Sequence, residues 1–401
     1  MAEKQNTPEI RFEGFTDPWE QRKLGSIAAS FDYGLNAAAT EYDGQNNYLR
    51  ITDIDDTTHE FLKSDLTTPL ADLAMSADYL LEEGDLLFAR TGASVGKTYL
   101  YRQYDGTVYF AGFLIRARIG ESADPEFVYQ ATLTDAYKKY VAITSQRSGQ
   151  PGVNAQEYAD YQLMLPSRTE QQQIGMTLRS LDNLITLHQR KYDKLCTVKK
   201  SMLDKMFPKL GETEPEIRFE GFTDPWEQRK FSDLTDRVSI QSSDSDLPQV
   251  EYEDIVSGEG TLNKDLRDKE GGKTGIKFYA GDVLYGKLRP YLMNWLYPQF
   301  NGVAVGDFWV LRATKCDSSF LYRLIQTNNF QRLANVSSGS KMPRADWNLI
   351  SQSFFAVPAD HAEQKAIAKS LAELDSLITL HQRKFELLRN IKKSLLDRMF
   401  V

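Results

Sequence analysis

Apolar side chains recur at alternating steps of three and four residues along two long stretches of the chain. These stretches, 169–207 and 362–400, contain no proline and a single glycine, Gly175. Such spacing places apolar side chains on one stripe of a helix, the a/d seam of a coiled coil. Each stretch is predicted to form one helix, roughly 58 Å long at about 1.5 Å per residue.

A seam of this length needs a partner, and the other copy is the best one available. Because each helix follows its own domain, an antiparallel pair is expected to place the two domains at opposite ends, related by a pseudo-twofold axis. The predicted seam positions are Leu178, Leu181, Ile185, His188 and Leu195 in the first helix, and Leu371, Leu374, Ile378, His381 and Leu388 in the second.

Polar residues interrupt both seams at matching places: His188 matches His381, and Lys199 matches Lys392. Polar seam residues fix helix register at some cost in stability. Zinc binding or catalysis by the histidines is the alternative, and it is disfavoured because no cluster of other metal ligands accompanies them. The sequence predicts no metal site.

The rest of the chain alternates short apolar runs with glycine turns, which is typical of strands. The predicted strands span 82–91, 97–101, 107–119 and 161–166, then 280–290, 301–313 and 352–358. Helices are predicted over 123–140 and 318–333, and loops over 145–154 and 337–347. The common order predicts a strand-rich α+β fold that is used twice.

The chain is a tandem repeat. Residues 8–23 recur without change at 215–230, and the two helical blocks share 22 of 39 positions. The sequence between the repeated parts shows little obvious similarity. This layout predicts a first domain over 1–168, a spacer helix over 169–207, a second domain over 208–361 that opens with a linker at 208–214, and a C-terminal spacer helix over 362–401. In the repeated opening segment, Phe12, Phe15 and Trp19 are expected to anchor the first strand to a helix end.

Composition limits the functional classes. A hydrophobic content of 41% and a charged content of 26% are typical of a globular protein. No stretch approaches the ~20 apolar residues of a membrane helix, so no membrane partner is expected. The two isolated cysteines, Cys196 and Cys316, fit a reducing cytoplasm. The net charge of -8 means that any DNA contact must come from local basic loops or from partner subunits.

Three features together resemble the DNA-specificity subunit of type I restriction–modification systems. They are a Gly-Asp-(Leu/Val)-Leu-(Phe/Tyr) strand followed by a basic loop, at Gly84 and at Gly281; a Ser-Gly loop near each domain end; and heptad helices that end in Lys-Lys-Ser-x-Leu-Asp-(Lys/Arg)-Met-Phe. The resemblance spans nearly the whole chain. It implies two target-recognition domains, each reading one half of a split, asymmetric site in double-stranded DNA.

The resemblance also implies partners: two methyltransferase subunits docked on the helices, and two restriction subunits that translocate DNA. S-adenosylmethionine, ATP and Mg are expected on those partners, with no cofactor bound by this chain.

Candidate DNA-binding residues are the polar and basic residues of the predicted loops, because such side chains reach phosphates and base edges. Any one of them could equally be a solvated loop residue. The candidates in the first domain are Arg50, Arg90, Thr91, Ser94, Lys97, Gln146, Arg147, Ser148, Gln150 and Asn154. The candidates in the second are Lys287, Arg289, Tyr291, Ser340, Lys341 and Arg344.

Enzymatic motifs are incomplete in this sequence. The stretch 92–98, Gly-Ala-Ser-Val-Gly-Lys-Thr, leaves three residues between its glycines where a phosphate loop needs four. The repeated Thr-Asp-Pro-Trp has one proline, whereas an adenine methyltransferase carries an (Asn/Asp)-Pro-Pro-(Tyr/Phe/Trp) motif. We therefore expect a chain that is not catalytic alone. The alternatives are a self-contained methyltransferase or nuclease, and a coiled-coil scaffold that does not read DNA.

Overall fold

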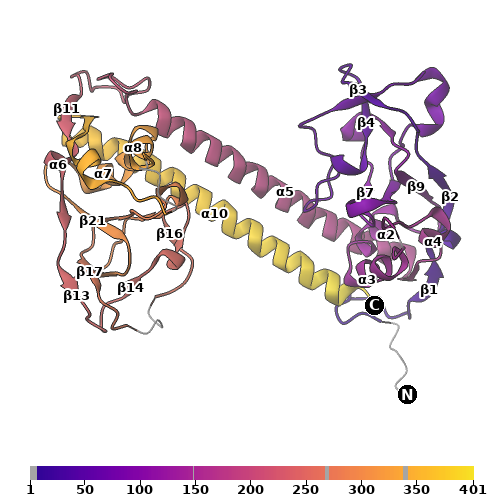
Figure 1. The fold of residues 1–401 in the computed structure, drawn as a ribbon. Coiled ribbons are helices and arrows are strands. Elements are labelled where there is room, and N and C mark those ends of the chain that lie inside the picture. The colour runs from indigo at the N-terminus through magenta and orange to yellow at the C-terminus, as the bar shows by residue number, and fades with distance from the viewer. Residues whose placement is uncertain (1–6, 148, 267–270, 337–341) are drawn as a thin grey trace. The chain divides into compact units, whose positions relative to one another are not determined.

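The chain folds into two compact units that share its two long helices. The computed structural model describes residues 7–147, 149–266, 271–336 and 342–401. Unit 1 combines the chain up to Arg190 with Gln382–Val401, and unit 2 is Lys191–His381. Helix α5 (Arg168–Lys205) therefore begins in unit 1, where α10 (His361–Met399) ends, and the roles are exchanged in unit 2 (Figure 1). Within each unit the two helices run in opposite directions.

Unit 1 is built on a four-stranded antiparallel sheet in the order β2-β9-β6-β7. Smaller pairs surround it: β1 with β10, β3 with β5, and β4 parallel to β8. The strands are β1 Glu20–Lys23, β2 Ala28–Tyr33, β3 Ala39–Glu41, β4 Asn46–Leu49, β5 Thr67–Pro69, β6 Asp85–Ala89, β7 Thr98–Leu100, β8 Thr107–Phe110, β9 Leu114–Ile119 and β10 Gln162–Leu165. The short helices are α1 Leu24–Ile27, α2 Pro125–Ala131, α3 Asp135–Thr144 and α4 Ala155–Ala159.

Unit 2 repeats the main sheet, in the order β12-β21-β18-β19, and has a second four-stranded sheet in the order β13-β17-β20-β14. Its strands are β11 Glu227–Lys230, β12 Thr235–Val238, β13 Gln241–Ser242, β14 Gln249–Val250, β15 Ile255–Val256, β16 Thr261–Leu262, β17 Gly275–Phe278, β18 Val283–Gly286, β19 Trp295–Leu296, β20 Gly302–Ala304, β21 Phe308–Ala313 and β22 Phe354–Val357. Its short helices are α6 Phe231–Leu234, α7 Ser318–Leu324, α8 Asn328–Ala334 and α9 Trp347–Gln352. The predicted double use of one α+β fold is confirmed.

Two predicted strands are each divided in the structure. The stretch 107–119 forms β8 and β9, which belong to different sheets, and 301–313 forms β20 and β21 in the same way. In the first domain a turn at Ala111–Leu114, closed by the Leu114 N–H donating to the Ala111 carbonyl at 2.8 Å, redirects the chain. An apolar run shows burial but not the sheet to which it belongs, so the prediction of single strands was wrong.

The predicted helices over 123–140 and 318–333 are also divided. Thr134 ends the turn after α2 and its side chain accepts a hydrogen bond from the Tyr137 N–H, which starts α3. Thr327 does the same for Phe330 at the start of α8. A threonine at this position is a strong helix start, and this cap is the signal that helical spacing alone missed.

The predicted seam lies on the buried side of both long helices. Leu178 and Leu371 are fully buried, and the other predicted seam positions are buried or half-buried. In unit 1, Leu178 shares a core with Leu396 and Met399 of α10. In unit 2, Leu371 shares a core with Met206 and Phe207, at the end of α5.

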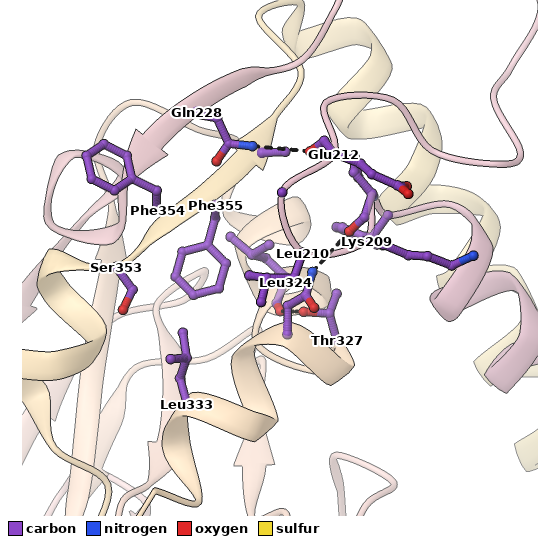
Figure 2. Close-up of a pocket in the computed structure, with 15 residues that line it drawn as sticks. Lys209, Leu210, Glu212, Gln228, Leu324, Thr327, Leu333, Ser353, Phe354 and Phe355 are labelled. Atoms are coloured by element: carbon purple, nitrogen blue, oxygen red, sulfur yellow. Dashed lines mark hydrogen bonds between the residues drawn. The ribbon is translucent and has the colours of Figure 1, made fainter.

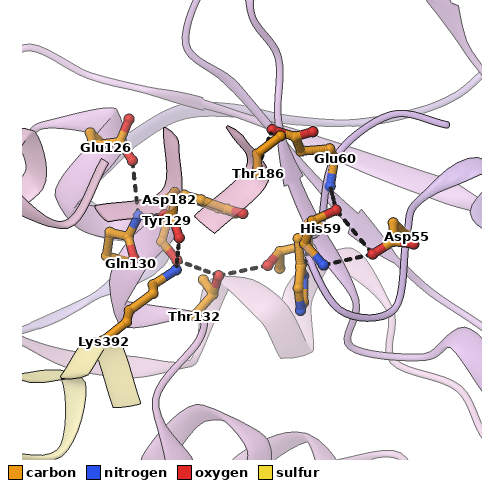
Figure 3. A network of polar contacts seen from close by, with 12 residues as sticks. Asp55, His59, Glu60, Glu126, Tyr129, Gln130, Thr132, Asp182, Thr186 and Lys392 are labelled. Atoms are coloured by element: carbon orange, nitrogen blue, oxygen red, sulfur yellow. Dashed lines mark hydrogen bonds and ion pairs between the residues drawn. The ribbon is translucent and has the colours of Figure 1, made fainter. Parts of the chain in front are cut away.

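The seam lysines form reciprocal ion pairs between the helices. In unit 1, Lys392 Nζ lies 2.5 Å from Asp182 Oδ1, and in unit 2, Lys199 Nζ lies 2.5 Å from Asp375 Oδ1. The two pairs occupy equivalent repeat positions. Asp182 also accepts a hydrogen bond from Gln130 Nε2 of α2 at 2.8 Å (Figure 3). Each carboxylate thus joins both long helices to its own domain.

The tryptophan of the repeated opening segment anchors each domain to a helix end, as predicted. Trp19 is buried and packs edge-on against Phe127 of α2 and Phe400, just beyond α10. Trp226 packs in the same way against Phe320 and Phe207. Phe12 is half-buried against the core of unit 1.

The ion pair of unit 1 is expected to contribute to stability mainly by satisfying a buried cation. Asp182→Ala leaves Lys392, whose side chain is 14% exposed, without its carboxylate. We expect the free energy of unfolding to fall by about 1–3 kcal/mol, measured as a shift in the denaturant midpoint. Asp182→Ala combined with Lys392→Met should lose less, because no buried charge is then unpaired.

Glu373→Ala is a matched control, because Glu373 makes a 4.0 Å contact with Lys369 on an exposed surface. It should leave the midpoint unchanged. An Asp182→Ala midpoint equal to that of this control would contradict a structural role for the seam ion pair.

Candidate nucleic-acid interface

Each domain carries a hairpin loop between the third and fourth strands of its main sheet, counted in sheet order. We call residues 90–97, between β6 and β7, the hairpin loop of the first domain, and residues 287–294, between β18 and β19, that of the second. Each contains one short 3-10 turn, Gly92–Ser94 or Pro290–Leu292.

A second loop pins each hairpin loop, and we call it the flanking loop (residues 145–154, and 342–347 among the described residues of the second domain). Thr91 bridges Gly152, and Leu288 bridges Arg344. The Gly92 N–H donates to the Pro151 carbonyl at 3.0 Å, and the Arg289 N–H donates to the Pro343 carbonyl at 2.8 Å. The structure therefore brings together, in each domain, the two loops on which most candidate residues lie.

In each domain one tyrosine hydroxyl makes hydrogen bonds to backbone groups at or beside the hairpin loop. Tyr158 donates to the Ala89 carbonyl at 2.7 Å and accepts from the Gly96 N–H at 3.2 Å. Tyr252 donates to the Asp307 carbonyl and accepts from the Leu288 N–H at 3.2 Å. Burial raises the pKa of both hydroxyls, so both remain protonated donors. Sequence reasoning missed these residues, because nothing in a lone tyrosine indicates a distant loop.

Three basic candidates of the first domain are oriented by neighbours. Arg50 makes two hydrogen bonds of 2.8 Å to the Asp53 carboxylate, which raise the pKa of Arg50. Lys97 forms an ion pair with Asp56 and donates to the Ile54 carbonyl at 3.3 Å. The Arg90 guanidinium lies over the Tyr33 ring, 5.1 Å from its centroid. Arg50 and Lys97 thus hold the local chain together, while Arg90 lies at the base of the hairpin loop.

The candidates on the flanking loop divide into structural and exposed residues. Arg147 donates to the Thr144 carbonyl at 2.8 Å and pairs with Glu157. The Asn154 side chain accepts from the Glu157 N–H at 2.9 Å and caps α4. Gln146 and Gln150 are exposed, and Ser148 lies outside the described residues.

The remaining candidates of the first domain lie on the hairpin loop itself. Thr91 donates to the Pro151 carbonyl at 3.4 Å, and Ser94 is half-buried within the 3-10 turn. A Cβ at Gly92 would stand 2.9 Å from Gln150 Nε2, so the amide of Gln150 lies directly over that glycine. Gln150 and the hairpin loop therefore share one surface.

One carboxylate orients two of the second domain's cations. Asp307 Oδ1 lies 3.5 Å from Lys287 Nζ, and Asp307 Oδ2 accepts from Arg344 Nη2 at 2.9 Å. Arg289 and Tyr291 are exposed at the tip of the hairpin loop. Ser340 and Lys341 lie outside the described residues. Asp307 was not anticipated, since an acidic residue is no obvious part of a DNA-binding loop.

The paired loops offer cations, amides and hydroxyls that can reach phosphate oxygens and base edges. Among the described residues, no group of three or more His, Cys, Asp or Glu side chains could hold a metal ion. Over the same residues, no helix is long and apolar enough to cross a membrane.

A cavity of about 360 Å³ lies elsewhere in the second domain (Figure 2). Its wall is largely apolar, with Phe355, Leu324 and Leu333 on one side and the linker residues Lys209–Glu212 on the other. None of its lining residues belongs to the hairpin or flanking loop. The cavity separates the linker from the domain core and adds nothing to the candidate interface.

The fold defines a class of protein: tandem α+β domains with paired loops, carried on long shared helices. Residues 16–196 match the family described as the type I restriction modification DNA specificity domain. The type I restriction enzyme MjaVIII specificity subunit of Methanocaldococcus jannaschii is 21% identical over 364 residues, covering 84% of this chain and 83% of that protein. The EcoDI specificity subunit of Escherichia coli is 26% identical over 184 residues, covering 44% of this chain and 41% of that protein.

The fold is shared with a solved structure. The crystal structure of the type I restriction-modification system S subunit from M. genitalium aligns with a TM-score of 0.68 at 12% identity, covering 98% of this chain and 99% of that one. The predicted resemblance is confirmed: the chain is similar to the specificity subunits of type I restriction–modification systems.

Substitutions of Asn154 test whether its side chain caps α4 or contacts a DNA base. Asn154→Ala removes the cap of α4 and should lower the free energy of unfolding by about 1 kcal/mol, whereas Asn154→Asp should retain the cap. Thermal unfolding of the three proteins measures the difference. If Asn154→Ala instead unfolds like the unmodified chain and loses DNA recognition, Asn154 is a DNA contact and not a structural residue.

Proposed function

We propose that this chain is the sequence-reading subunit of a type I restriction–modification complex. It recognises a bipartite, asymmetric site in double-stranded DNA, with one half-site per domain, and docks two adenine methyltransferase subunits and two restriction subunits. In this proposal the two reading domains span 1–168 and 208–361, and the reading residues lie on their hairpin and flanking loops.

The observation that carries this proposal is that both hairpin loops have the same backbone hydrogen bonds but different side chains. The pinning hydrogen bonds of the two hairpin loops are equivalent, whereas Thr91, Gly92 and Ser94 are replaced by Leu288, Arg289 and Tyr291. A constant frame holds the loops at equivalent places, and unlike side chains then favour different base pairs. Two unlike readers imply a site whose halves differ.

The exposed loop groups suit base reading. Arginine pairs with the guanine O6 and N7 acceptors, and glutamine pairs with adenine N6 and N7. Gln146 and Gln150 of the first domain and Arg289 of the second are exposed groups of these types. Because the chain's net charge is -8, nonspecific attraction to phosphates is weak, and these local contacts must supply much of the recognition.

The helices carry a repeated apolar surface that supports partner docking. Residues 184–191 are identical to 377–384. Within this run Leu184 and Leu187 are 43% and 44% exposed, and Leu377 and Leu380 are 44% and 45% exposed. Exposed leucines retained in both copies support two equivalent docking positions for one kind of partner.

Catalysis is assigned to the partners. S-adenosylmethionine, ATP and Mg are bound there, and this chain contributes recognition and assembly. A self-contained methyltransferase or nuclease is the alternative, and activity of the purified chain alone would establish it.

The proposal is tested by methylation. We expect the purified chain to transfer no methyl groups, and the chain combined with its methyltransferase subunit to methylate adenine within a split motif, mapped by sequencing DNA from cells that express only these two proteins. Methyl transfer by the chain alone, or a single continuous motif, would refute the proposed division of labour.

The docking surface is tested by the pair Leu187→Glu and Leu380→Glu. Charges on this face should weaken methyltransferase binding by at least about tenfold, measured by titration calorimetry, with the helix content unchanged. Leu387→Lys is the control: Leu387 is 59% exposed, and the other copy carries Lys194 at this position. Equal affinities for the control and the double variant would remove the leucines from the interface.

A further inference from the structure

The hairpin loop of the second domain contains two side chains in a backbone conformation that favours glycine. Arg289 has a φ of 49° and Met293 a φ of 53°. L-residues avoid this left-handed region because the Cβ crowds the following carbonyl oxygen. His59, at 56°, is the other non-glycine residue with positive φ in the described parts of the chain.

The first domain uses glycine at both equivalent positions. Gly92 has a φ of 72° and Gly96 a φ of 84°. The equivalence rests on backbone hydrogen bonds: the Val95 N–H donates to the Gly92 carbonyl at 3.1 Å, as the Leu292 N–H donates to the Arg289 carbonyl at 2.8 Å. The frame therefore suits glycine at both places, and the second domain keeps larger side chains against this preference.

Contacts within the protein do not account for the presence of side chains at these two positions. Arg289 is exposed, Met293 is 42% exposed, and neither side chain makes a hydrogen bond or ion pair within the described parts of the chain. Met293 packs in neither hydrophobic cluster of its domain. By contrast, His59 is half-buried and its Nδ1 lies 3.0 Å from the Thr98 carbonyl oxygen, a contact that accounts for a side chain there.

The two domains also differ in the space around these positions. A Cβ at Gly96 would come within 2.6 Å of Val141 Cγ1 on α3, so the first domain leaves no room for a side chain. In the second domain Met293 points away from the core, beside the exposed Tyr291 and Leu292. Strained residues persist where a function requires them, and an outward-facing cation next to an apolar edge is suited to an external ligand.

We infer that Arg289 and Met293 determine the sequence specificity of the second domain by contacting base edges in the major groove. The inference rests on the proposed function. Arg289 reads a guanine through its O6 and N7, and Met293, with Leu292 and Tyr291, packs against the methyl group of an adjacent thymine. The half-site of the second domain is therefore expected to contain a guanine next to a thymine.

The test uses glycine substitutions in the complete chain bound to its methyltransferase. Because glycine suits the left-handed conformation, Arg289→Gly and Met293→Gly should fold with an unchanged or higher Tm. Arg289→Gly should reduce discrimination at one base pair of the second half-site by roughly 5- to 150-fold, with the first half-site read as before. Methylation rates on a set of single-base variants of the site measure this.

Two controls separate base reading from other roles. Arg289→Lys retains the charge and should not restore discrimination, because lysine lacks the guanidinium fork. His59→Gly should lower the Tm, since its ring has a partner inside the fold.

Different results would contradict the role of Arg289 and the proposed function of the chain. An Arg289→Gly complex that binds all sequences more weakly to the same degree, with full discrimination, would make Arg289 a phosphate contact and overturn the inference. A wild-type complex that methylates no split site would overturn the proposed function itself.

Discussion

The architecture of each unit depends on a carboxylate that neutralises a lysine in the helix seam. Asp182 binds Lys392 of the opposite helix and Gln130 of its own domain, and Asp375 binds Lys199 and, at 2.6 Å, Nη1 of Arg323. A lysine in an apolar seam is unfavourable in any register that leaves it without a carboxylate. The ion pairs therefore select one register, and through α2 and α7 they also fix how each domain sits on its helices.

The sequence predicted those parts of the structure in which apolar residues recur at a regular spacing. A three-four spacing required α5 and α10, and the lysines at Lys199 and Lys392 were recognised as breaks in the seam. It did not predict their partners, because Asp182 and Asp375 lie beside the seam and are ordinary surface residues to a periodic pattern. The divided strand at 107–119 was missed for a related reason: Val108 and Ile115 are equally buried and belong to different sheets.

The stretch 145–154 is a loop in the structure, as predicted, but the roles of its residues could not be read from the sequence. Asn154 and Arg50 have the residue types of DNA contacts, yet in the structure they cap α4 and bind Asp53. Chemistry alone does not tell whether a polar group faces its own backbone or the solvent. That distinction comes from tertiary contacts such as the Tyr252 and Asp307 network, which join residues far apart in the chain.

Some of the acidic residues of the chain have a structural role in the loops. Lys97, Arg147 and Arg344 each have a carboxylate partner that holds the side chain in place. Such pairing reduces the ordering entropy that a flexible cation loses on binding, and it also weakens indiscriminate attraction to phosphate. A reader of base sequence gains from both effects, since its selectivity is the difference between specific and nonspecific affinity. In the proposed function, these carboxylates orient the loop cations and at the same time weaken nonspecific binding.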